Sequence, residues 1–378
     1  MALKHFTPIF HVPLLLLLLA FFGTQSVQAQ VYSNREVNPN REVVSDSLKQ
    51  IKYPYVLPIL GEKAAQAGYT LPLSAGMSLN YLFQESDVTI NNLMIGFNNG
   101  PMYNLDDVIR FKNAQARTSA FNFRPDIWIL PFLNVYGIIA GSASSTEVDF
   151  GVFVPNGTGY TEIIDLQTKA DFSGLTAGFG ITPTIGIANG WLALDMNFTW
   201  TDIDALEEPA FSFVFGPRMG KTFKFSKKSN LAVWVGGFRV KINSGTSGTL
   251  PLDALLSGEG ALEKIDQGYM RLEEAQNQLD SWWEGLTSAQ QRIYQPVYDR
   301  SNEAIGRVGE ALNALENGLN QIGESTVQYS LDKQQKEMWN FLVGAQYQLN
   351  PKWMFRGEVG FLGTRTQVLA GIQYRFGL

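Results

Sequence analysis

The sequence predicts an all-β membrane protein, a closed antiparallel transmembrane β-barrel of about twelve strands with an inserted α-helical hairpin. Three observations lead to this fold class. Many segments of about ten residues alternate between apolar and polar side chains, as strands with two different faces do. Their polar faces are rich in Gly, Asn, Gln and Thr instead of the Lys and Glu of a solvated surface, and only 17% of the chain is charged. One region, residues 252–333, has helical periodicity instead.

Residues 1–29 have the features of a secretory signal peptide. Lys4 gives a positively charged start, residues 14–22 form an apolar core, and Val27-Gln28-Ala29 places small residues at a cleavage site. No Cys follows the core, so we expect no lipid anchor at the mature N-terminus. A retained N-terminal membrane anchor is the alternative interpretation.

The composition argues against several classes of enzyme. The chain has no Cys, and its two histidines, His5 and His11, both lie in the predicted signal peptide. The mature chain therefore lacks the side chains for Ser-His-Asp catalysis, Cys-His catalysis and His-liganded zinc. We expect no enzymatic activity, no metal site and no cofactor. The basic run at residues 221–228 is explained by a strand that leads into a basic turn, so we expect no nucleic-acid binding.

Residues 30–72 are predicted to form a mixed lead-in to the barrel. A polar stretch precedes Tyr53-Pro54-Tyr55, and a short helical run over residues 59–66 ends at Gly68. Such a segment can lie in the periplasm as a partly ordered lead-in, or it can fold back and plug the lumen.

The barrel is predicted over residues 73–378. Its clearest strands are the last three, in which aromatic residues lie near the ends of the apolar face: residues 337–349, 352–361 and the run that ends near Phe376. Further alternating segments bring the total to about a dozen. They fall near residues 75–84, 88–98, 115–128, 133–142, 145–154, 159–167, 174–182, 191–202, 210–225 and 230–242.

Two architectures produce such strands: a soluble sandwich or barrel with the apolar face inside, and an outer-membrane barrel with the apolar face toward lipid. Strand length, polar-face composition and aromatic strand ends favour the second. The signal peptide, the alternation and the closing Gln373-Tyr374-Arg375-Phe376 resemble the outer-membrane β-barrel proteins of Gram-negative bacteria. The resemblance implies a bacterial outer-membrane location, contact with outer-membrane lipid and lipopolysaccharide, and insertion by the barrel assembly machinery. In this chain Gly377 and Leu378 follow the terminal aromatic residue.

Residues 252–333 are predicted to form an antiparallel helical hairpin inserted in an extracellular loop of the barrel. Apolar side chains at three- and four-residue steps form one seam over residues 262–286 and another over 294–322, with Gly285 between them. The insert has 14 acidic and 6 basic side chains, a net charge of −8. Since both termini of such barrels are periplasmic, three strands after the insert put it on the outer side.

Trp282 and Trp283 lie near the tip of the predicted hairpin. They are candidates for contact with a partner, and the alternative is that they pack the turn. The acidity of the insert can serve a partner or a homo-oligomer, or it can simply solvate the outer faces of two helices.

Six charged residues are candidates for lining the lumen, because they interrupt strands that are otherwise set against lipid: Asp195, Arg239, Lys241, Arg356, Glu358 and Arg375. Isolated charges on membrane strands are costly without water or a partner. They can therefore line an aqueous path or pair across a filled interior. The first functional hypothesis is a passive channel or transporter for small solutes, with these charges as selectivity elements. The alternative is a non-conducting surface protein whose acidic hairpin binds a partner or mediates oligomerisation.

Overall fold

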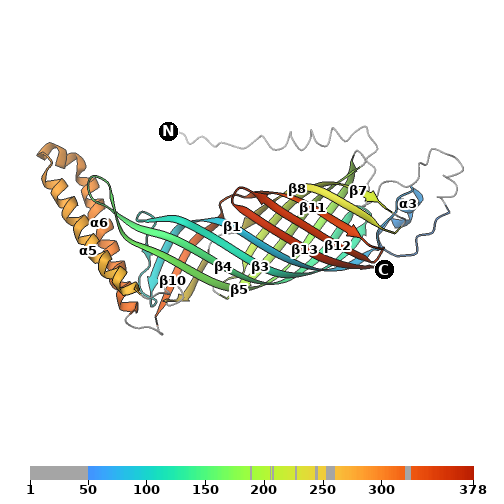
Figure 1. The fold of residues 1–378 in the computed structure, drawn as a ribbon, viewed down its shortest axis with the longest axis horizontal. Helices are drawn as coiled ribbons and strands as arrows, with labels where there is room; N and C mark the ends of the chain where they lie inside the picture. The colour runs from blue at the N-terminus through green and yellow to red at the C-terminus, as the bar shows by residue number, and fades with distance from the viewer. Residues whose placement is uncertain are drawn as a thin grey trace, which may run out of the picture.

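The computed structural model describes residues 50–378 except 188–189, 205, 207, 226–227, 243–245, 253–259 and 320–324. The predicted signal peptide and residues 30–49 of the predicted lead-in lie outside the described residues. The described chain is a β-barrel with a helical hairpin at one end and the C-terminus at the other (Figure 1).

Ten strands of the described chain form a closed antiparallel barrel. Successive barrel strands pair with one another, β8 pairs with β11 across the insert, and β1 pairs with β13 to close the ring. The closing register runs from Ala75 opposite Phe376 to Ser86 opposite Arg365. The barrel strands are β1 (Ala75–Phe97), β3 (Ile109–Leu130), β4 (Leu133–Pro155), β5 (Tyr160–Ile187), β6 (Gly190–Ile203), β7 (Ala210–Lys224), β8 (Asn230–Ile242), β11 (Trp339–Gln348), β12 (Trp353–Leu362) and β13 (Arg365–Phe376).

The barrel has ten strands instead of about twelve because three pairs of predicted segments are single long strands. The merged pairs are 75–84 with 88–98 in β1, 133–142 with 145–154 in β4, and 159–167 with 174–182 in β5. Polar residues between the paired segments, such as Glu85-Ser86-Asp87 in β1, stay in the strand ladder instead of turning the chain. A length of about ten residues fits a bilayer span, but it does not limit a strand that continues beyond the membrane.

In the closed section of the barrel, the outward-facing side chains are apolar, and the polar side chains face inward together with apolar ones such as Phe238 and Leu369. Leu79, Phe121 and Leu175 are 51%, 62% and 72% exposed on the outside, whereas Asn80, the residue after Leu79, lines the interior. An apolar outside matches the hydrocarbon core of a bilayer, and a closed ladder leaves no strand edge in lipid. The predicted resemblance to outer-membrane β-barrels is thereby confirmed at the level of architecture, and an outer-membrane location agrees with this surface.

Four barrel strands continue beyond the closed section as a protruding sheet, which we call the extension. It comprises residues 88–97 of β1, 109–115 of β3, 147–155 of β4 and 160–173 of β5, together with β2 (Tyr103–Asn104), β9 (Thr246–Pro251) and β10 (Thr326–Gln335). β10 pairs with the outer half of β1, from Val88 opposite Gln335 to Phe97 opposite Val327. The sequence pattern predicts residues 326–333 as part of the helical insert, but in the structure they belong to strand β10. The prediction is wrong because so short an alternating segment is hard to recognise beside two heptad patterns.

The polarity of the two faces inverts in the extension. Its outside carries ion pairs, in which Lys112 lies 2.8 Å from Glu162 and 2.9 Å from Asp165. Near the junction with the closed section, Arg117 lies 2.9 Å from Glu85. Charged side chains of this kind belong in water, so the lipid-facing surface ends near this last pair and the extension projects beyond the membrane.

The predicted hairpin is present as α5 (Ala261–Glu284) and α6 (Ser288–Leu319), which pack on the extension at the end opposite the C-terminus (Figure 1). Ile265 and Leu279 of α5, Val308 of α6 and Ile163 of β5 share one buried apolar core. The hairpin therefore covers the inner, apolar side of the extension. None of the described helices is both long and apolar enough to cross a membrane.

The described part of the lead-in packs at the barrel end that holds both termini of the sheet. The N–H of Leu57 donates to the carbonyl of Leu378 at 3.2 Å, and Nε of Arg375 donates to the carbonyl of Leu73 at 3.0 Å. The short helix α3 (Gly61–Gln66) lies beyond the strand ends (Figure 1). Of the two predicted placements, this position corresponds to a lead-in at the rim for residues 50–72.

Candidate transport pathway

The interior of the closed barrel is divided into cavities along its axis. One cavity of about 520 Å³ lies toward the extension and is lined by Ser, Thr, Asn and Gln side chains interspersed with Ala, Val, Leu, Ile and Phe. Hydroxyl groups on neighbouring strands of its wall form hydrogen bonds with one another: Thr118 with Ser144 and Thr176 with Thr201, each at 2.9 Å. Two smaller cavities of about 30 and 60 Å³ lie toward the C-terminal end. A layer of charged side chains separates the large cavity from the small ones.

We call this layer the belt, and its members are Asp195 from β6, Arg218 from β7, and Arg356 and Glu358 from β12. Nε and Nη2 of Arg218 donate to the two carboxylate oxygens of Glu358 at 3.1 and 3.2 Å, while Nη1 of Arg218 donates to Asp195. Arg356 donates from Nε to Oε1 of Glu358 at 3.0 Å. Since β8 and β11 lie between β7 and β12 in the wall, the bond from Arg218 to Glu358 reaches across the lumen.

The belt is well sheltered from solvent, and its surroundings compensate its charges. The side chains of Arg218, Asp195 and Glu358 are 14%, 8% and 2% exposed. The hydroxyl of Tyr136 on β4 donates to Oδ1 of Asp195 at 3.2 Å, and the guanidinium of Arg124 on β3 lies 3.3 Å from the centroid of the Tyr136 ring. Buried charges persist in proteins when they are paired and hydrogen-bonded in this way.

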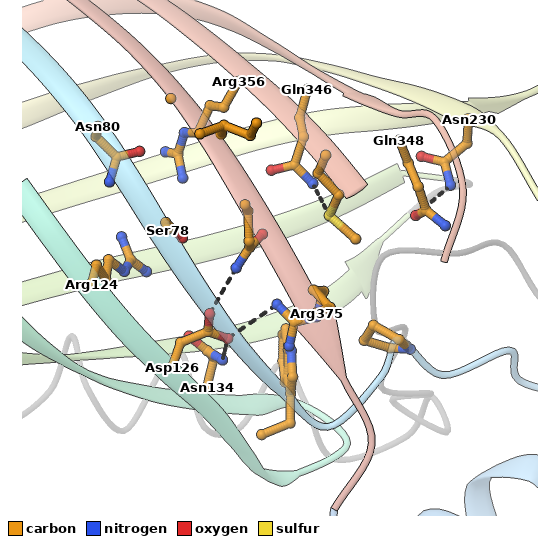
Figure 2. Close-up of a pocket in the computed structure, with 16 residues that line it drawn as sticks. Ser78, Asn80, Arg124, Asp126, Asn134, Asn230, Gln346, Gln348, Arg356 and Arg375 are labelled. Atoms are coloured by element: carbon orange, nitrogen blue, oxygen red, sulfur yellow. Dashed lines mark hydrogen bonds and ion pairs between the residues drawn. The ribbon is translucent and has the colours of Figure 1, made fainter. Parts of the chain in front are cut away.

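A second polar cluster lies nearer the C-terminal rim (Figure 2). Asp126 of β3 accepts hydrogen bonds from Asn134 at 2.9 Å, Gln373 at 2.7 Å and Arg375 at 3.0 Å. The side chains of Asp126 and Arg375 are 1% and 5% exposed. Because β13 and β3 both flank β1, these bonds brace the seam where the first and last strands close the barrel.

Four of the six predicted lumen residues face the interior. Asp195, Arg356 and Glu358 meet in the belt, and Arg375 belongs to the rim cluster. They pair with opposite charges, and the three belt residues also line the cavity of about 520 Å³, so the structure combines features of both arrangements that the sequence leaves open.

Arg239 and Lys241 do not face the lumen, and the prediction for these two residues is wrong. In β8 the buried side chains are Ala232, Trp234 and Phe238, so the odd-numbered residues, including the exposed Val233, form the outer face. Both faces of β8 are therefore apolar, and alternation alone does not show which one is inside. The two basic residues lie near the outer end of the strand, where long side chains of this kind reach the polar surface of a membrane.

Sequence reasoning missed Arg218, Arg124, Asp126 and Tyr136, although all four lie in predicted strands. Arg218 had the clearest signal, because it is a charge within an apolar strand and shares the even-numbered face of β7 with Ser212. The partner of each charge was beyond reach, since Arg218 and Glu358 are 140 positions apart in the chain.

Trp282 and Trp283 pack within the hairpin and against the extension. The ring of Trp283 stacks on Tyr298 at 4.5 Å between centroids, and Trp282 meets Tyr294 edge-on at 5.8 Å. Trp282 also lies directly against Gly157 in the β4–β5 connection, where φ is +90° and a side chain would have no room. Their contacts correspond to the packing alternative, and a contact with a partner remains a prediction.

No protein-family model and no curated protein matches this sequence. Among solved structures, the transport unit of the autotransporter AIDA-I from Escherichia coli is similar with a TM-score of 0.30 and 10% identity, covering 90% of this chain and all of that chain. An outer membrane channel from Pseudomonas putida F1 has a TM-score of 0.28 and 8% identity, with 81% and 96% covered. A Pseudomonas aeruginosa FadL homologue has a TM-score of 0.26 and 7% identity, with 82% and 94% covered. Because these TM-scores and identities are low, we describe the architecture of the protein from its own strand pairing and surface.

Proposed function

We propose that the protein is a passive outer-membrane transporter for small solutes and that the belt is the constriction on its path. The observation that supports this proposal is the placement of the belt between a cavity of about 520 Å³ and the smaller cavities toward the C-terminal end. Barrels of about eight strands are filled by side chains, whereas this wider barrel leaves space on both sides of one charged layer.

The belt also offers a way to open without leaving a charge unpaired. Glu358 binds both Arg218 and Arg356, and Arg218 binds both Glu358 and Asp195. If Arg218 turns toward Asp195 alone, Glu358 keeps Arg356 as its partner. A rearrangement that keeps every charge paired avoids the large cost of an isolated buried ion.

Planar-bilayer conductance of the refolded mature protein tests the proposal. We expect ion current through the wild type, and a changed conductance or ion selectivity in Arg356→Ala/Glu358→Ala, which shortens two side chains of the belt. The matched control is Arg239→Ala/Lys241→Ala, which also removes two charges, but from the outer face. This control should conduct like the wild type.

An unchanged current in the belt variant would show that the belt is not the constriction. Silence from all three proteins, once heat-modifiable gel mobility has shown that the barrels are folded, would refute the transport proposal. It would favour the second hypothesis, a surface protein whose acidic hairpin binds a partner or mediates oligomerisation.

A further inference from the structure

The extension and α6 line an apolar pocket of about 310 Å³. Its lining includes Phe97 of β1, Phe111 of β3, Phe150 of β4 and Leu315 of α6. This volume lies within the range of ordinary small-molecule sites. The pocket is thus apolar, lies in the part of the barrel that projects beyond the membrane, and adjoins the cavity of about 520 Å³ in the closed section.

An irregularity in β1 keeps the pocket apolar. Even-numbered residues up to Ile90 face the interior, and a register shift between Asn91 and Met94 then turns Leu93 and the odd-numbered residues after it inward. Asn92 within this shift has a φ of 52°. Bulges of this kind re-aim side chains and are common beside functional sites. Without this register shift, the apolar residues that follow Ile90 would face water.

A single basic residue, Lys333 of β10, lies where the apolar pocket meets the cavity of about 520 Å³, and it lines both. Its Nζ donates to Oγ1 of Thr146 on β4 at 2.9 Å. Among the described residues no carboxylate forms an ion pair with it. Burial is the one cause that lowers the pKa of this ammonium group, to about 8, and no charged group on β1, β4 or β10 contributes.

We propose that this pocket binds a small anionic amphiphile, a single alkyl chain with a carboxylate headgroup. The chain would lie among the aromatic and aliphatic side chains, and the carboxylate would bind Lys333 and Thr146. The inference rests on the proposed function in that it names the class of solute that enters the path.

The charge of the ligand follows from the surroundings of Lys333. A buried ammonium group without an opposite charge is costly, and an anionic headgroup supplies that charge through a strong, charge-assisted hydrogen bond. The alkyl chain gains free energy by leaving water. A neutral amphiphile offers only the second gain, and a cationic one meets repulsion.

Equilibrium dialysis against protein in lipid nanodiscs, with empty nanodiscs subtracted, tests the proposal with decanoate, decanol and decyltrimethylammonium as probes. We expect the wild type to bind decanoate at least about tenfold more tightly than the cation. Lys333→Met should weaken decanoate binding about tenfold or more, the effect of one hydrogen bond to a charged group, and should change decanol binding less than about twofold. The matched control is Lys336→Met. Lys336 follows the last residue of the same strand, is exposed and lies 3.9 Å from Asp87. This control should bind all three probes like the wild type.

A second variant tests the location of the alkyl chain. Ala311→Trp fills the pocket from α6, so it should weaken both decanoate and decanol. Equal decanoate affinity of the wild type and Lys333→Met, equal affinity of the wild type for decanoate and decanol, or no saturable decanoate binding would each overturn the proposal. Because dialysis needs no open pore, decanoate binding to a barrel that conducts no current would refute the proposed function and leave this inference standing.

Discussion

Removal of the Arg218 guanidinium should destabilise the barrel by about 3 kcal/mol. Arg218 bridges two carboxylates, and Arg218→Met leaves Glu358 with Arg356 but takes from Asp195 its ion-pair partner. Asp195 then keeps hydrogen bonds from Tyr136 and Thr182, which stabilise it only in part. Breaking a buried ion pair by removing one member costs about 3–5 kcal/mol, and the partner that Glu358 retains places this variant at the lower end.

Equilibrium unfolding in guanidinium chloride, followed by tryptophan fluorescence of protein in lipid vesicles, measures this free energy. Lys241→Met, which removes a charge from the outer face, is the control and should change stability by less than about 0.5 kcal/mol. Asp195→Asn/Arg218→Met should recover at least about 1 kcal/mol relative to Arg218→Met, because the isolated carboxylate is gone.

A cost below about 1 kcal/mol for Arg218→Met would refute this reasoning. Such a value is typical of ion pairs exposed to water. It would mean that the belt lies in an open aqueous channel and does not divide the lumen.

Two further predictions concern the extension. Between pH 7 and 9.5 decanoate stays ionised, whereas Lys333, whose pKa burial lowers to about 8, loses its proton. Decanoate binding should therefore weaken as the pH rises, with a midpoint above about 8, because the bound anion favours the charged lysine. A pH-independent affinity in the dialysis experiment would contradict this prediction. Replacing residues 253–324 by a short Gly/Ser linker retains β9 and β10 but removes α6 from the pocket. Decanoate binding in nanodiscs should then be lost, while the ion selectivity that we assign to the belt should be unchanged in planar bilayers.

The sequence predicts the strands that stay within the closed section well, because these strands are short. The predicted segments 191–202 and 352–361 correspond to Gly190–Ile203 and Trp353–Leu362. The hairpin is predicted because its heptad pattern is a local signal, and helices of this length repeat the pattern several times. In both cases residues that are neighbours in the chain determine the element.

The extension is not predicted because its strands change their apolar face partway. In β5, Leu166 lines the pocket on the inside, while Leu175 is exposed on the outside. One of these is even-numbered and the other odd-numbered, so a search for constant alternation divides the strand in two. The change of apolar face is itself a signal that a strand leaves the membrane without a turn. It can be recognised only when the lipid around the closed section and the water around the extension are both taken into account.

The belt is predicted only in part for a different reason. Alternation assigns a charge to one face of its strand, and where the opposite face is clearly apolar, as for Glu358 on β12, the assignment is right. It fails on β8, where Trp234 and Phe238 make the inner face apolar too. Which charges meet across the lumen depends on strand tilt and stagger, which are properties of the closed ring and not of any one segment.

The inversion of polarity also explains why a barrel of this kind carries a hairpin. Once β1, β3, β4 and β5 leave the membrane, their outer faces carry ion pairs and their apolar side chains turn inward, where an open sheet would expose them to water. The hairpin covers that face, and Ile265 and Val308 are buried against it. A cover with a purely structural role should close onto the sheet at the density of a protein interior. α6 instead leaves an apolar pocket beside Lys333, next to the cavity of about 520 Å³, which is the position that the proposed binding site on the proposed transport path requires.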